Sequence, residues 1–456
     1  MASIVNDGFL RFVLRPWAGH NYLARNLVFY TSWHVFGLHA APYFLIVLLT
    51  HLVNVWLLFG VIRTLTSSAM LACLGAALWG TSPIASATLG WYSVFGQVMA
   101  GTVFLAVLDR LVVLARAGAA LPAGTAWAWY ALLLVGTTCF GVGIGVALAF
   151  PLALFVMLPA AWRQPRVRAA FLALPAVTLV LYVALRRFYA FFLEPLSFQE
   201  LAAQPAGVRE LPLVLTGVWK LVAVAASEYP RSFFWAARAY PDRASSIVLL
   251  MVGAAVGAAW WRGRRETRRT VVALAALCFT MYFVIALGRA WLPLAVMVGQ
   301  ARYHYVAAIP IVVVICVALQ EIGRLGPLRR LPRIALAAAA LGLGVWGFAR
   351  STFRIEQYGA VRATVEATLR GIATEAARHA PGETVYLENG TNSAVVLGVM
   401  TPNELFPGRA AIFLLANDDD RVDGRPVRFV ERDRRILTRY QQPPSRLGHL
   451  LVPPRP

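Results

Sequence analysis

The stretch from Ala40 to Ile62, "AAPYFLIVLLTHLVNVWLLFGVI", decides the class of this protein. It contains no Asp, Glu, Lys or Arg. As a helix it would be about 35 Å long, which is enough to cross the roughly 30 Å of hydrocarbon in a bilayer. An uncharged apolar run of this length predicts a transmembrane helix.

The rest of the chain has the same character. Of its 456 residues 59% are hydrophobic and only 14% are charged, whereas about 25% are charged in an ordinary soluble domain. Mostly apolar runs lie near residues 40–62, 68–89, 94–114, 126–161, 168–187, 245–261, 270–288, 304–321 and 334–349. The run 126–161 is long enough for two helices, with a turn among residues 139–151. The sequence therefore predicts an all-α polytopic membrane protein with a bundle of about ten transmembrane helices.

The basic residues indicate topology rather than nucleic-acid binding. The net charge is +21, but Lys220 is the only lysine, and the arginines lie in short segments between apolar runs. Five basic clusters lie in every second connection between successive predicted spans, at Arg63, 110–116, 163–168, 262–269 and 324–333. All five can face the cytoplasm, as the positive-inside rule and the anionic inner leaflet favour. The outer face then receives residues 1–40, 82–97, 188–244, 289–303 and everything after Arg350.

This topology divides the chain into two domains. Residues 1–350 form the transmembrane domain, with outer loops at 1–39 and 188–244, and we expect an interfacial or re-entrant helix near Lys220. Residues 351–456 form a small extracytoplasmic α/β domain, because a helical stripe at 356–379 precedes three strand-like stretches. The opening "MASIVNDGFLRF" is not a signal peptide. A chain whose N-terminus lies outside is difficult to insert without one, so we expect a further span upstream of Met1.

Polar side chains gather at the outer ends of the predicted spans, where they are candidates for function because polar groups are costly in lipid. The candidates are Asp7, Arg15, His20 and Asn21 in the opening stretch, Trp91, Tyr92 and Gln97 in the turn 82–97, and Arg302, Tyr303, His304 and Tyr305. No cluster has the ligand spacing of a metal site, so the sequence assigns no metal ligand and leaves a need for divalent metal open.

Three segments resemble one family. "LRPW…LVFYTSWHVFGLHAAPYFLIVLLTHLVNVWLLFGVIRTL", "GTSPIASATLGWYSVFGQVMAG" and "QARYHYVAAIP" are similar, in this order, to segments of the GT-C membrane glycosyltransferases, the superfamily of protein O-mannosyltransferases and related bacterial enzymes. Together they cover most of residues 10–320. The resemblance implies a GT-C-like helix bundle with its active site in the outer loops. It also implies transfer of a sugar from a polyprenyl phosphate carrier to an acceptor hydroxyl on the extracytoplasmic face of the bacterial inner membrane.

The resemblance also suggests roles for the candidates. Arg302, and after it Arg15, would bind the carrier phosphate, because a guanidinium is an always protonated, bidentate partner for it. Asp7 would be the general base that takes the proton of the attacking hydroxyl. The other candidates would bind substrate. The acceptor, whether protein, lipid or polysaccharide, is not specified, and no other cofactor is implied.

The chain also departs from the family pattern. GT-C enzymes usually carry acidic residues in an outer loop after a first span, and Ser82 and Ala87 stand where many relatives have His and Glu. Two other functions therefore stay open: a transporter or flippase for a lipid-linked sugar, and a non-catalytic membrane subunit of the cell envelope. Single residues also have structural readings. Arg302 can be an interfacial anchor, and the aromatic residues an aromatic belt. His51 and Asn54 can bond neighbouring helices.

Overall fold

The structure is a computed structural model. It describes residues 8–193 except 18, 38, 83 and 84, then 210–231, 243–289, 300–325, 338, 341–347 and 349, and three short strands near the C-terminus. The chain divides into two compact units. One comprises Val13–Thr352, and the other comprises Met1–Phe12 with Phe353–Pro456.

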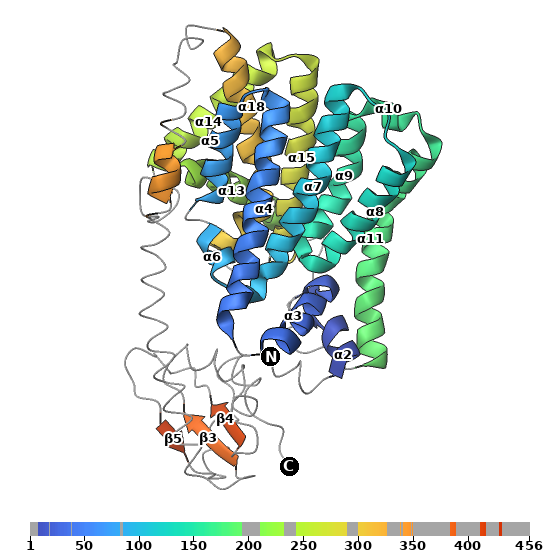
Figure 1. Ribbon diagram of the computed structural model, residues 1–456, viewed down its shortest axis with the longest axis vertical. Coiled ribbons are helices and arrows are strands. Elements are labelled where there is room, and N and C mark those ends of the chain that lie inside the picture. Colours follow the sequence, from blue (N-terminus) through green and yellow to red (C-terminus); the bar gives the residue numbers. More distant parts are fainter. Residues whose placement is uncertain are drawn as a thin grey trace. The chain divides into compact units, whose positions relative to one another are not determined.

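The unit from Val13 to Thr352 is a bundle of helices packed side by side (Figure 1). After α2 (Gly8–Leu14), which begins before this unit, and the strands β1 (Pro16–Trp17) and β2 (His20–Asn21), its elements are helical. They are α3 (Leu23–Phe36), α4 (Ala40–Thr66), α5 (Ala69–Gly80), α6 (Ser86–Leu89), η2 (Tyr92–Val94), α7 (Phe95–Ala117), α8 (Ala123–Cys139), α9 (Gly141–Met157), α10 (Pro159–Trp162), α11 (Pro165–Phe192), α13 (Leu211–Arg231), α14 (Arg243–Arg262), α15 (Arg265–Leu287), η4 (Ala301–Tyr303), α17 (His304–Ala307) and α18 (Ile309–Leu325).

Among the residues that the structure describes, four helices are long and apolar enough to cross a membrane. They are α4, the run Tyr92–Ala117, α11 and α15. A fifth span results if the pair Ala301–Ala307 and Ile309–Gly323, bent by 57°, is counted as one. Large apolar side chains such as Trp56 (71% exposed) and Leu250 (73% exposed) cover the outside of the bundle, where lipid would contact them. These are the features of a membrane protein.

The predicted count of about ten spans is not supported. The predicted runs from 40 to 321 consist of helices with short breaks where they are described, and several of these helices are shorter than a span. The run 68–89 gives α5, which ends at Gly80, and the run 126–161 gives the predicted helix pair, α8 and α9. Phe140 separates the pair in an extended conformation (φ −162°, ψ 155°). The segment predicted as the outer loop 1–39 contains two helices, α2 and α3, where it is described.

Buried polar groups join the helices in the middle of the bundle. The imidazole of His51 on α4 lies 2.8 Å from the Tyr305 hydroxyl and 2.8 Å from the Gly80 carbonyl oxygen. The amide of Asn54 donates to the Val98 carbonyl at 3.0 Å and to the same hydroxyl at 3.3 Å. His51 and Asn54 therefore bond neighbouring helices, which confirms the structural reading of both residues.

The second unit contains a three-stranded sheet of order β4-β3-β5. β3 (Thr384–Glu388) pairs in parallel with β4 (Ala411–Leu415) and antiparallel with β5 (Arg428–Val430). Each strand falls in one of the predicted strand-like stretches, which are 383–389, 410–417 and 425–433. The predicted helix 356–379 lies outside the described residues, so the α/β domain stays a prediction.

Within the unit Val13–Thr352, the described parts of the predicted outer and cytoplasmic segments lie at different ends of the bundle. At one end, which we call the basic end, Leu65, Arg116, Leu158, Arg264 and Glu321 line one cavity. At the other, which we call the aromatic end, His20, Gln97, Phe140, Arg289 and Tyr303 line a second cavity. Helices such as α7 and α15 run from one end to the other. This partition agrees with the one that the arginine clusters predict, whereas the side of the membrane on which each end lies stays a prediction.

Candidate functional site

The aromatic end places His20 on a small hairpin. β1 and β2 pair antiparallel, with Trp17 opposite His20. The amide of Asn21 donates to the Tyr182 carbonyl at 2.8 Å, and the Tyr182 hydroxyl donates to the Gly19 carbonyl at 2.8 Å. Asn21 thus fixes the hairpin to α11. Its predicted role in substrate binding is untested, but its amide already has this structural partner.

His20 and Arg289 meet at the centre of the site. The Nε2 atom of His20 lies 3.0 Å from Nη2 of Arg289, and because a guanidinium can only donate, Nε2 accepts. Arg289 also donates through Nε to the Tyr303 hydroxyl at 3.1 Å. The imidazole packs on the Phe140 ring, at 4.7 Å between centroids, and a Cβ at Gly141 would lie 2.3 Å from its Nδ1 atom. Only glycine at position 141 leaves room for the imidazole.

The surroundings of His20 keep it neutral at pH 7. Desolvation lowers the pKa of its imidazole well below the ordinary 6.5, and the charges of Arg289, Arg25 and Arg186 lower this pKa further. A neutral imidazole whose Nε2 already accepts a hydrogen bond is a poor general base. Its chemistry in this arrangement is to orient Arg289.

Arg25 is a second fixed cation beside this pair. It donates through Nη1 to the Ser93 carbonyl at 3.0 Å and through Nη2 to Oδ1 of Asn26 at 2.7 Å, and it lies 3.4 Å above the centre of the Tyr22 ring. Desolvation lowers the pKa of its guanidinium to about 10, so the group stays charged at pH 7. The amide of Asn26 in turn donates to the Arg15 carbonyl at 3.0 Å.

Arg302 has a different environment. Its guanidinium carbon lies 4.9 Å from the Trp91 ring centre and 5.2 Å from that of Tyr303. Within the described part of the chain the guanidinium makes no hydrogen bond. Trp91 is 50% exposed, so this pair lies at the surface. Aromatic faces hold the plane of the cation while its N–H groups stay available.

Of the other predicted site residues, Gln97, His304 and Tyr305 are buried and Tyr92 is half-buried. Gln97 is buried and lines the His20 cavity. Tyr92 stacks on Phe29, at 4.4 Å between centroids. The Nδ1 atom of His304 lies 2.9 Å from the Tyr282 hydroxyl, and Tyr305 is fully buried in the network with His51. Their roles in binding stay predictions; His304 and Tyr305 lie inside the protein and are already hydrogen-bonded.

The cavity at this site is small. Its volume is about 30 Å³, and the described residues that line it include no carboxylate. Asp7, the predicted general base, lies outside the described residues. Among the residues that the structure describes, no group of three or more His, Cys, Asp or Glu could hold a metal ion. The charges of Arg289, Arg25 and Arg186, which come from three segments, act on His20, so the positive potential here attracts anions.

Sequence reasoning missed Arg289 and the site role of Arg25. A signal for Arg289 existed, because it is the first residue of a predicted outer segment, 289–303, and arginine is disfavoured on that side. An arginine that opposes the topology rule needs a partner or a function. Comparisons with protein-family models, with curated proteins and with solved structures find no match for this chain.

Proposed function

We propose that this chain is a membrane glycosyltransferase of the GT-C type, which moves a sugar from a polyprenyl phosphate carrier to an acceptor hydroxyl at the aromatic end. One observation carries the proposal: the contact of Arg302 with Trp91. These residues belong to two of the three segments that resemble the family, and the contact joins them. His20, from the first of the three segments, accepts a hydrogen bond from Arg289. Arg289 also donates to the hydroxyl of Tyr303, the neighbour of Arg302 in the sequence.

The chemistry of the transfer suits the free edge of Arg302. Breaking the bond between sugar and phosphate leaves negative charge on a lipid phosphate, and a positioned guanidinium stabilises that charge. A cavity of about 30 Å³ holds about one water molecule, so we assign the carrier phosphate to the exposed edge of Arg302. Arg289 and Arg25 add positive potential behind it. Asp7 is proposed as the general base because His20 is too weak a base.

The proposal places the aromatic end on the outer face of a bacterial inner membrane. The donor is a lipid-linked sugar within the bilayer, and the acceptor approaches from outside. A flippase for the same lipid would use these arginines to bind the carrier phosphate but would need no general base. A non-catalytic subunit would need neither the phosphate ligands nor the base.

A transfer assay tests the proposal. The protein is reconstituted in liposomes with radiolabelled polyprenyl phosphate sugars and a cell-envelope extract as acceptor. Arg302→Ala should lower the rate of transfer about a hundredfold, which is the loss typical of removing one charge-stabilising donor, and Asp7→Asn should abolish transfer. Arg110→Ala is the matched control, because Arg110 is exposed at the basic-end side of α7.

The outcomes separate the alternatives. Transfer that is unchanged in both variants removes the site assignment. Wild-type protein that moves labelled lipid between leaflets without forming a glycosylated product is a flippase. Wild-type protein that does neither, with every tested donor, supports the non-catalytic subunit.

A further inference from the structure

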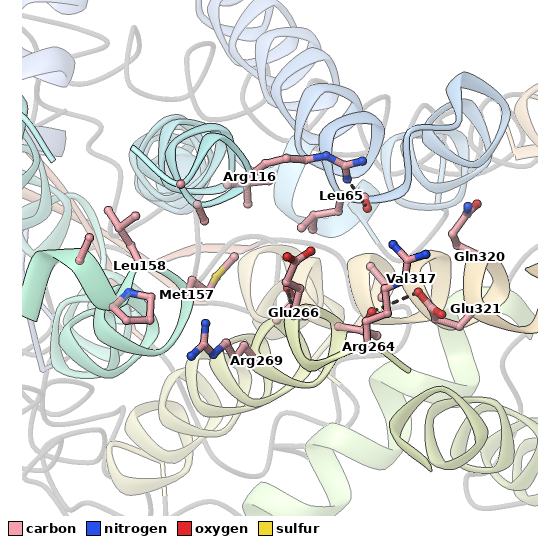
Figure 2. Close-up of a pocket in the computed structure, with 17 residues that line it drawn as sticks. Leu65, Arg116, Met157, Leu158, Arg264, Glu266, Arg269, Val317, Gln320 and Glu321 are labelled. Atoms are coloured by element: carbon pink, nitrogen blue, oxygen red, sulfur yellow. Dashed lines mark hydrogen bonds between the residues drawn. The ribbon is translucent and has the colours of Figure 1, made fainter. Parts of the chain in front are cut away.

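The basic end contains a second, larger cavity, drawn in Figure 2. Its volume is about 350 Å³, within the range of small-molecule sites, which begins at about 300 Å³. Residues of α4, α7, α15 and α18 and the junction of α9 with α10 line it. The walls are partly apolar, through side chains such as Leu65, Val112 and Met157. The cavity therefore combines apolar walls with charged groups at the end of helices that can cross a membrane.

Two of the charged residues at this cavity already have structural roles. Arg116 donates to the Thr64 carbonyl at 2.6 Å, to the Leu65 carbonyl at 3.0 Å and to the Ser67 hydroxyl, and so closes the last turn of α4. Glu321 is 6% exposed and accepts a hydrogen bond of 3.1 Å from the Thr267 hydroxyl. Neither group is available without breaking these contacts.

Three other charged side chains at the cavity are available. Arg264, Glu266 and Arg269 lie at the start of α15, and Figure 2 shows Glu266 between the two arginines. Within the described residues none of these three side chains forms a hydrogen bond or an ion pair. Unpaired charges around one cavity provide two sites for anionic oxygens and one for a cationic donor.

This set of charges matches a zwitterion. Two guanidinium groups suit a phosphate, whereas a carboxylate beside them repels a second anionic group and attracts an ammonium. A phosphodiester joined to a primary ammonium by two carbons is the headgroup of an ethanolamine phospholipid. We propose that the basic-end cavity binds this headgroup, with Arg264 and Arg269 on its phosphate and Glu266 on its ammonium. The apolar walls would contact the glycerol end of the lipid.

The source of the phosphate is a lipid in this proposal because of where the cavity lies. The cavity is at the ends of α4, α7 and α15, three helices that are long and apolar enough to span a bilayer. The ends of such helices lie at the depth of the lipid headgroups. A soluble phosphate would contact the arginines but has no cationic group for the exposed carboxylate of Glu266. The site lies at the opposite end from Arg302 and does not depend on the proposed glycosyl transfer.

Native mass spectrometry of the full-length protein in detergent tests the proposal. Dioleoyl phosphatidylethanolamine, dioleoyl phosphatidylglycerol and inorganic phosphate are titrated separately. The wild type should bind the ethanolamine lipid most tightly. Arg269→Gln should weaken that binding about tenfold, because a bidentate charge-assisted contact is lost. Glu266→Gln should weaken binding of the ethanolamine lipid but not of the glycerol lipid.

Arg265→Gln is the matched control, because Arg265 is exposed on the same turn and does not line the cavity. It should bind as the wild type does. Size-exclusion profiles check folding, and if Arg269→Gln does not fold, Arg269→Lys, which keeps the charge but loses the bidentate geometry, is measured instead and should also bind more weakly.

Three results would overturn the proposal. The first is tighter binding of the glycerol lipid than of the ethanolamine lipid by the wild type, since Glu266 would then have no ammonium to bind. The second is equal binding by Arg269 variants and the control. The third is displacement of the bound lipid by inorganic phosphate at equal concentration, which would make this a site for soluble anions.

Discussion

The two ends of the bundle hold their arginines in different ways. At the aromatic end Arg25 and Arg289 donate to fixed acceptors, namely the Ser93 carbonyl, the Asn26 side chain, Tyr303 and His20, and the cavity beside them is about 30 Å³. At the basic end Arg264 and Arg269 have no such partner among the described residues, and the cavity is about 350 Å³.

This difference shows two uses of the same side chain. Burying a guanidinium costs free energy unless hydrogen bonds replace its water, and Arg25 and Arg289 have such acceptors. Fixed cations do not need to reorganise when charge develops beside them, which suits catalysis. Arginines without partners keep their conformational freedom and lose it only when a ligand binds, which suits reversible binding. Arg25 and Arg289 therefore fit the proposed transfer as fixed charges behind Arg302, whereas Arg264 and Arg269 fit the proposed capture of a lipid headgroup.

The largest expected effect is on the free energy of unfolding, through the packing of α9 against α15. α9 packs against α15 so closely that a Cβ at Gly145 would lie 2.7 Å from Cα of Met281, a backbone atom that cannot move aside alone. Gly145→Ala should therefore lower the free energy of unfolding by about 3 kcal/mol, as overpacking does. Denaturant titration in detergent micelles measures it.

Gly253→Ala on α14 is the matched control, because a Cβ there would have no neighbour within 4 Å. It should leave stability unchanged or raise it slightly, since alanine favours helix. If both variants lose the same free energy of unfolding, the close packing of α9 on α15 at Gly145 does not contribute to stability as predicted.

The sequence predicts the helices well and their lengths less well. The run at 40–62 becomes α4, because its apolar composition leaves no alternative to a long helix. The run at 68–89 does not remain one helix, since α5 ends at Gly80 and Thr81 follows in a non-helical conformation. Ser82 and Pro83 come next in the sequence, and the residue before a proline disfavours helix. A count of apolar residues ignores such breaks, and it therefore predicts about ten spans.

The site was only partly predictable, for a different reason. That Trp91 and Arg302 lie on one side follows from topology, and their contact agrees with it. The pairing of Arg289 with His20 depends on Gly141 leaving space for the imidazole. No periodicity or motif records which side chains meet when α9, α15 and the first hairpin pack. Tyr305 was placed in the site by its position in a motif, whereas its contacts are with His51 and Asn54 inside the bundle.

A smaller effect should appear as a dependence of stability on pH. The pKa of His20 is lowered in the folded protein, so between that pKa and about 6.5 the unfolded chain binds more protons than the folded one. Stability should therefore rise with pH through this interval and fall as the medium is acidified below about pH 6.5, by at most about 1.4 kcal/mol per pH unit for one proton.

His20→Gln should remove this component, so the difference in stability between wild type and variant should change with pH below 6.5 and be constant above it. Thermal unfolding at a series of pH values from 5 to 8 measures the difference. Parallel curves over the whole range would mean that His20 is not held neutral by Arg289 and its other neighbours.

The smallest expected effect distinguishes, at the basic end, an arginine that stabilises the fold from an arginine that binds the lipid. Arg116 lines the same cavity as Arg269, but it bonds the Thr64 and Leu65 carbonyls at the end of α4. Arg116→Gln should lower the free energy of unfolding by about 0.5–1 kcal/mol, as expected for an exposed group at a helix C-terminus, and should leave binding of the ethanolamine lipid within about twofold. Arg269→Gln should do the reverse, losing lipid affinity while unfolding at the wild-type midpoint. If Arg116→Gln loses as much lipid affinity as Arg269→Gln, then both arginines bind the ligand, and partners within the protein do not distinguish structural arginines from binding arginines.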